Sequence, residues 1–128
     1  MKTISDINAD TREFLSAAGA EVVITHDFTG WENAGSAILI TETRIEYEHQ
    51  QDLDMTWHRT ATITAQLIAK DLDTLTGMVD NITEAPEYEG DTLHTILIES
   101  VTIGTEEGPL HTARIILWAE IWDYDDDA

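Results

Sequence analysis

Five histidines are the side chains of this sequence that could most readily support a metal site or acid–base catalysis. They occur singly, with neither the His-x-x-x-His nor the His-x-His spacing that directs two imidazoles at one ion: His26, His49, His58, His94 and His111. Cysteine is absent, so neither a cysteine-containing zinc site nor a thiol nucleophile can form. The sequence therefore predicts no metal site and no cofactor.

Motifs for nucleophilic or phosphate chemistry are also missing. The sequence contains no Gly-x-Ser-x-Gly elbow, no Ser-x-x-Lys and no glycine-rich phosphate loop. Asp71 and Asp73 lack the later oxygen ligands, the central glycine and the closing glutamate of a calcium loop. Carboxylate pairs at the spacing used by glycosidases would arise by chance among 26 acidic residues. We therefore expect no catalytic residue and no enzymatic activity.

The charge of the chain is strongly one-sided. Six Lys and Arg stand against 26 Asp and Glu, a formal net charge of -20, which argues against nucleic-acid binding through phosphate contacts. Such self-repulsion is tolerated best in concentrated salt, where the Debye length falls to about 3 Å. We predict a protein of a salt-loving host, the alternatives being an acidic mesophilic protein and a carboxylate-based cation binder.

Length and pattern predict a single α+β domain over residues 1–128 with a solvated acidic tail at 123–128. Apolar spacing predicts a helix over Ser5–Ala18, ended by Gly19, and a second helix beginning near Asp71 and including Leu72–Ile82. The remaining apolar stretches predict a short strand at Glu21–Phe28 and four long strands: Ala37–His49, Trp57–Ala69, Leu93–Ile103 and Leu110–Tyr124. The expected fold is two long antiparallel hairpins in one sheet with a short extra strand, both helices packing on one face.

Matching the polarity of opposed residues predicts the register of each hairpin. In the first hairpin the predicted pairs are Tyr47 with Arg59, Ile45 with Ala61, Thr43 with Ile63 and Leu39 with Leu67. In the second hairpin the pairs on the core face are His94 with Ala119, Ile96 with Leu117, Ile98 with Ile115 and Ser100 with Ala113. These pairs predict that the reverse face of the first hairpin is polar and solvent-exposed.

The reverse face of the second hairpin is apolar as well. It is predicted to pair Thr95 with Trp118, Leu97 with Ile116, Val101 with Thr112, Ile103 with Leu110, and Glu99 with Arg114 as a charge pair. Two helices are too few to cover both faces of such a sheet. We therefore predict a subunit interface at Leu97, Ile116, Trp118 and Trp122. The alternative is that the loop Thr29–Ser36, which carries Trp31, covers this face.

The order helix, short strand, long hairpin, helix, long hairpin resembles the tail terminator, or tail-completion, proteins of long-tailed phages and haloarchaeal tailed viruses. The resemblance spans Ser5 to Tyr124 and includes the segment Arg-Thr-Ala-Thr-Ile-Thr-Ala-Gln-Leu at 59–67, followed by a helix. It also includes the closing segment Thr-Ala-Arg-Ile-Ile-Leu-Trp-Ala-Glu-Ile-Trp at 112–122. The family has no catalytic signature, so the resemblance implies no site residues.

The resemblance implies a virion protein that forms a homo-oligomeric ring, expected as a hexamer, at the head-proximal end of the tail tube. Its expected partners are itself, the tail tube protein and the head–neck connector proteins, with DNA passing through unbound. No apolar run approaches the roughly 20 residues that span a bilayer, and no signal sequence is evident, so we expect no membrane partner and assembly in the host cytoplasm. The alternatives are another neck connector or stopper, and a halophilic small-molecule enzyme of α+β fold.

Overall fold

The protein is described by a computed structural model that covers residues 3–24, 35–49, 57–85, 88, 90, 92–104 and 110–121. Its strands form a five-stranded sheet in the order β1-β2-β3-β5-β4. The strands are β1 (Val22–Ile24), β2 (Ser36–His49), β3 (Trp57–Ala69), β4 (Leu93–Ile103) and β5 (His111–Ile121). β1 pairs parallel to β2, and all other pairs are antiparallel. The expected α+β class, with two long hairpins and a short extra strand, is confirmed.

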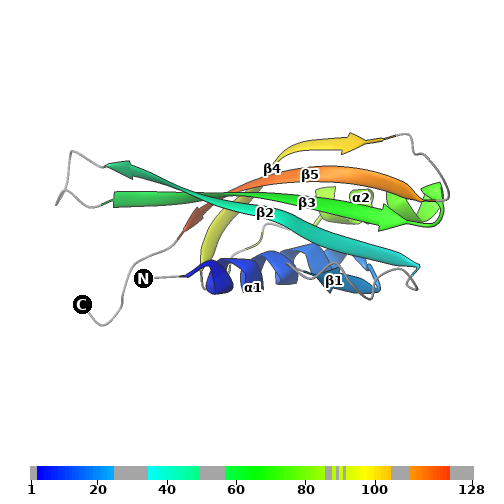
Figure 1. The fold of residues 1–128 in the computed structure, drawn as a ribbon, viewed down its shortest axis with the longest axis horizontal. Helices are drawn as coiled ribbons and strands as arrows, with labels where there is room; N and C mark the ends of the chain where they lie inside the picture. The colour runs from blue at the N-terminus through cyan, green and yellow to red at the C-terminus, as the bar shows by residue number, and fades with distance from the viewer. Residues whose placement is uncertain are drawn as a thin grey trace.

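Two α-helices are described, and both pack on one face of this sheet. α1 (Ile4–Leu15) continues into a single 3-10 turn, η1 (Ser16–Ala18), and α2 (Leu72–Thr83) connects β3 to β4. Figure 1 shows α1 running alongside the long β2 and β3 strands. Helix side chains such as Leu15 and Leu75 join one core cluster with alternate residues of β3 and β5, Ile63 and Leu117 among them. All four are fully buried, and each burial stabilises the fold by about 1.5–3 kcal/mol.

Local capping explains where the helices begin and end. The Thr3 hydroxyl accepts a hydrogen bond from the Asp6 amide while the Asp6 carboxylate accepts from the Thr3 amide, a reciprocal capping box. The cap is thus Thr3, and the helix begins at Ile4, one residue before the predicted Ser5. Gly19 ends the 3-10 turn with a φ of 79°, as its predicted role as terminator requires.

Asp71 caps α2, as its position before the apolar spacing suggested. Its carboxylate accepts hydrogen bonds from the amide of Thr74 at 2.8 Å and from the hydroxyl of the same residue at 2.9 Å. Hydrogen bonds of this kind favour the charged carboxylate, so they hold the pKa of Asp71 below its ordinary value. The negative charge also lies where the helix dipole is positive.

The register of the first hairpin is confirmed over its distal part and wrong nearer the start of β2. Tyr47 pairs with Arg59 and Thr43 with Ile63, but a bulge between Ile40 and Glu42 shifts the remaining pairs by one. Leu67 therefore faces Ile38 and not the predicted Leu39. The extra residue at the bulge, Thr41, turns the chain so that Ile38 and Ile40 enter the core, both fully buried.

The register of the second hairpin was predicted wrongly at every pair. His94 already faces Glu120 and not the predicted Ala119, and two bulges in β4 increase this offset from one residue to three at Ile103. The shifts lie between His94 and Ile96 and between Ile98 and Ser100. In place of the predicted pairs, the structure places Ile96 opposite Ala119, Leu97 opposite Trp118, Ile98 opposite Leu117, Ser100 opposite Ile116, Val101 opposite Ile115 and Ile103 opposite Ala113. Polarity matching cannot find a bulge, because it assumes equal numbers of residues on both strands.

α1 also holds the start of β4 through a buried carboxylate. Asp10 Oδ2 accepts hydrogen bonds from the amides of Thr92 and Leu93, each at 2.8 Å. A β-carbon on Gly90 would collide with the same carboxylate, so glycine is required for this close approach. Hydrogen bonds to a buried charged group contribute about 1.5–3 kcal/mol each, which fixes β4 relative to α1.

Tyr88 lies beside this contact and provides a test of it. Its hydroxyl donates to Glu13 Oε2 at 3.1 Å, and its ring meets Phe14 edge-on with centroids 5.9 Å apart. Burial, followed by the negative charge of Asp10 and the bond to Glu13, raises the pKa of Tyr88 above its ordinary value of 10.0.

We expect Tyr88 to ionise above its ordinary range in a titration followed by phenolate absorbance. Because the pKa is raised in the folded state, the stabilisation by Tyr88 is complete below about pH 10 and is lost as the pH rises further. Tyr88→Phe should remove the late titration step. A late step that persists in Tyr88→Phe would contradict this assignment.

Candidate interaction surface

The sheet face opposite α1 and α2, here called the outer face, is built from rows of side chains that cross the strands. The successive pairings place Arg44, Thr62, Trp118 and Leu97 in one row, and Glu42, Thr64, Ile116 and Ser100 in the next. A row of Glu46, Thr60, Glu120 and His94 lies on one side of them, and a row of Leu39, Gln66, Arg114 and Thr102 on the other.

The middle of the outer face is apolar where β4 and β5 meet. Leu97 is 51% exposed, and the neighbouring Ile116 and Trp118 are half-buried. Trp118 lies directly between Leu97 on β4 and Thr62 on β3. The structure thus brings together three of the four residues predicted as an interface, Leu97, Ile116 and Trp118. The fourth, Trp122, lies outside the described residues.

This apolar area is smaller than the sequence suggested. The bulge at Glu99 moves Val101 and Ile103 from the outer face to the core side, where they pair with Ile115 and Ala113. Val101 packs against the core cluster, and Ile103 stays 46% exposed at the end of its strand. The apolar centre of the outer face therefore consists of Leu97, Ile116 and Trp118, and polar rows flank it.

One end of the outer face is not open. Ala37, Leu39 and Ile68 have outer-face positions in the register but are between 1% and 6% exposed. The predicted alternative, a covering loop at 29–36 with Trp31, falls largely outside the described residues. At its described end, the Gly35 carbonyl accepts a hydrogen bond from the Lys70 amide at 3.2 Å.

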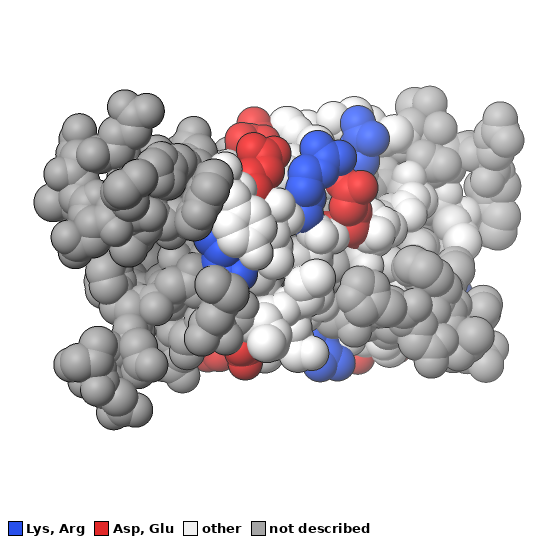
Figure 2. All heavy atoms as spheres, turned by 60° about the vertical axis from the view of Figure 1, so that its left-hand side comes forward, with Lys and Arg blue, Asp and Glu red and all other residues white. Residues whose placement is uncertain are grey.

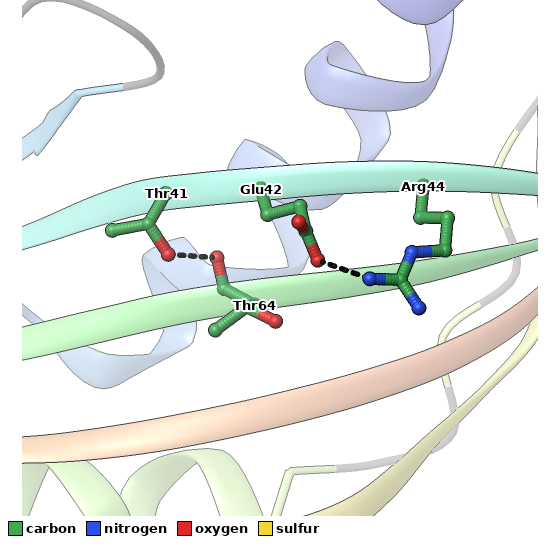
Figure 3. A network of polar contacts seen from close by, with 4 residues as sticks. All are labelled: Thr41, Glu42, Arg44 and Thr64. Carbon is green, nitrogen blue, oxygen red and sulfur yellow. Dashed lines mark hydrogen bonds and ion pairs between the residues drawn. The ribbon is translucent and has the colours of Figure 1, made fainter.

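Charged and hydroxyl side chains border the apolar centre on the β2 side. Arg44 forms an ion pair with Glu42 at 3.3 Å, with both side chains more than half exposed. Figure 3 shows this pair beside the β2 bulge, where the Thr41 hydroxyl donates to the Thr64 carbonyl at 3.1 Å. On the surface in Figure 2, basic side chains likewise lie next to acidic ones among uncharged residues. An apolar centre with a polar rim is the usual anatomy of a protein–protein interface.

A cavity of about 270 Å³ opens beside this centre. Strands β2, β3, β4 and β5 all contribute to its lining, which includes Thr41, Gln66, Thr102, Thr112 and Arg114. The predicted charge pair of Arg114 with Glu99 is wrong, because Glu99 is the extra residue of a bulge and Arg114 faces Thr102 instead. Arg114 is exposed and forms no ion pair with any residue in the described part of the chain.

The histidines that the structure describes do not share a site. His94 pairs with Glu120 on the outer face, whereas His111 pairs with Ala69 at the opposite end of β5. His26 and the side chains of His49 and His58 lie outside the described residues. Within the described ranges, no group of three or more His, Asp or Glu side chains is placed to hold a metal ion. Neither described helix is long and apolar enough to cross a membrane.

Comparison with known proteins identifies the fold and no sequence family. No family model matches the sequence, and no curated protein matches it. Among solved structures, a chain from the "virion of native gene transfer agent (GTA) particle" superposes with a TM-score of 0.62. The match covers 84% of this chain and 83% of that chain at 10% sequence identity. At this identity, the likeness shows a shared fold.

Two adjacent residues of β5 distinguish the core from the outer face. Leu117 is fully buried in the core cluster and Trp118 is half-buried on the outer face. Leu117→Ala should reduce the free energy of unfolding by about 2–5 kcal/mol. Trp118→Ala should have a smaller effect on unfolding and should weaken self-association by about 2 kcal/mol, as loss of an interface anchor does.

Denaturant unfolding and sedimentation, both in the same molar salt, would measure the two effects. The reverse result, with Leu117→Ala weakening association and Trp118→Ala unfolding the chain, would mean that the two faces have been exchanged.

Proposed function

We propose that this chain is a structural protein of a tailed virus, a tail terminator that forms a homo-oligomeric ring at the head-proximal end of the tail tube. The observation that carries the proposal is the fold shared with a gene transfer agent virion chain over more than four-fifths of both chains. The resemblance seen in the order of elements and in the 59–67 and 112–122 segments points to the same class. The proposed domain is the whole of residues 1–128, with an acidic tail at 123–128.

The outer face supports self-assembly. Its centre at Leu97, Ile116 and Trp118 is apolar, and neither described helix covers it. A stable interface buries about 800 Å² on each partner, more than three side chains provide, so the proposed contact includes the threonine-rich rows around them. A contact between two different surfaces of identical copies closes into a ring when the rotation per copy allows it. We expect a hexamer, with Trp122 joining the same interface.

The partners in this proposal are further copies of the chain, the tail tube protein and the head–neck connector proteins. DNA would pass through the ring without specific binding, because a chain of charge -20 repels phosphates. The location would be the neck or tail of the virion, after assembly in the host cytoplasm. A neck connector or stopper belongs to the same structural class and differs in which virion protein the ring binds.

The oligomeric state tests the proposal directly. In molar salt, light scattering coupled to size exclusion should report a closed oligomer of defined mass. Trp118→Glu should convert it to a folded monomer, because a charge in the apolar centre would be buried without a partner. Ser5→Glu adds the same charge at an exposed position of α1 and should leave the oligomer intact. A wild-type chain that remains monomeric at high concentration would refute the ring.

The salt-adapted host is a separate part of the proposal with its own test. The 26 acidic residues repel one another less when salt shortens the Debye length. As potassium chloride is dialysed to tens of millimolar, the near-ultraviolet circular dichroism of the tryptophans should be lost, and it should return when salt is restored. Full retention of the signal in dilute buffer would contradict the assignment to a halophilic host.

A further inference from the structure

The cavity beside the apolar centre combines one cation with several uncharged polar groups. Arg114 projects from β5, Gln66 from β3 and Thr102 from β4, and the Thr41 hydroxyl borders the same space from the β2 bulge. Arg114, Gln66 and Thr102 offer guanidinium, amide and hydroxyl donors, whereas the Thr41 hydroxyl already donates to the Thr64 carbonyl. Among the described residues, the lining includes no carboxylate, although the chain carries 26 of them. The cavity is therefore suited to accept an anion.

Arg114 differs from the other arginine of the outer face. Arg44 is neutralised by Glu42 of the same strand at 3.3 Å. Arg114 has no such partner among the described residues, and its cross-strand neighbours Gln66 and Thr102 are uncharged. In a chain of net charge -20, a guanidinium without a neighbouring carboxylate favours binding of a carboxylate from another molecule.

The size of the cavity limits its occupant. A volume of about 270 Å³ is below the roughly 300–1,000 Å³ of typical small-molecule and cofactor sites. It is sufficient for one aspartate or glutamate side chain. A carboxylate matches the planar fork of a guanidinium and accepts two of its hydrogen bonds.

The position of the cavity indicates where the carboxylate comes from. Arg114 and Ile116 are two residues apart on the same face of β5, about 7 Å along the strand. A protein docked on Ile116 and Trp118 therefore reaches Arg114 as well. Another copy of this chain presents an acidic surface of complementary charge.

We propose that the Arg114 cavity receives an aspartate or glutamate side chain of a second copy of this chain and so fixes the orientation of neighbouring subunits. This inference rests on the proposed self-assembly and adds to it the contact that sets the register between copies. Burial of the apolar centre stabilises the contact between copies. The carboxylate in the cavity then selects one orientation among those that the apolar contact alone permits.

A zero-length crosslink tests the contact. Arg114→Lys keeps the positive charge and supplies an amine that a carbodiimide couples only to a carboxylate in direct contact. Nitrogen-15-labelled and unlabelled chains of this variant are mixed, assembled in molar salt and crosslinked, and the crosslinked peptides are identified by mass spectrometry. We expect a crosslink from position 114 to an Asp or Glu in which the two peptides carry different isotopes. Crosslinks from Lys2 and Lys70, which the wild-type chain already contains, measure the background of the reaction.

A second measurement does not depend on crosslinking. Arg114→Gln should raise the dissociation constant of the assembly at least about tenfold and leave the thermal unfolding of the monomer unchanged. Arg12→Gln removes one positive charge at an exposed position of α1, away from the outer face, and should change the dissociation constant less than about twofold.

The outcomes separate this inference from the proposed function. An assembled chain whose position-114 crosslinks stay within one copy, or that forms none there, overturns the cavity contact and leaves the ring standing. Equal effects of Arg114→Gln and Arg12→Gln on association overturn it too. A chain that is monomeric under all conditions refutes the proposed function, and the cavity contact with it.

Discussion

The antiparallel pairing of β3 with β5 joins the two hairpins into one sheet, and both faces of the molecule depend on it. Ten consecutive pairs, from Thr60 opposite Glu120 to Ala69 opposite His111, run without a bulge. This regular register keeps Ile63 and Leu117 in one core and Thr62 and Trp118 together on the other side. Because α1 and α2 occupy only the core side, neither described helix covers Thr62 and Trp118 on the other side.

Periodicity in the sequence was sufficient to predict the elements and most of their faces. Alternation in β3 and β5 places every second residue in the core, and the helical spacing of Leu72, Leu75, Val79 and Ile82 identified α2. The three bulges were not predictable by the same means, since an extra residue leaves composition unchanged and alters only the pairing. In the first hairpin the register error begins at Thr41. In the second, an offset of one residue is already present at His94 and grows to three across Thr95 and Glu99.

The apolar centre was predictable and the cavity was not, for related reasons. Ile116 and Trp118 lie on the regular strand β5. Because side chains alternate along a strand, residues two apart share a face, so their common face could be predicted from the sequence. The same alternation predicted Glu99 as the charge partner of Arg114. Glu99 belongs to the irregular strand β4, however, and does not pair with Arg114. The cavity is lined from four strands that include the bulge residue Thr41. Only the three-dimensional register brings these residues together.

The irregularity of β4 has a consequence for how far assembly can proceed. β4 is an edge of the sheet, and edge strands with free backbone groups invite open-ended strand addition. Thr95, with a φ of 57°, holds a conformation that is costly for a β-branched residue, by about 1–3 kcal/mol. Together with the bulge at Glu99, it breaks the straight ladder that an incoming strand would need. An added strand would therefore meet an interrupted ladder along this edge, which disfavours open-ended strand addition.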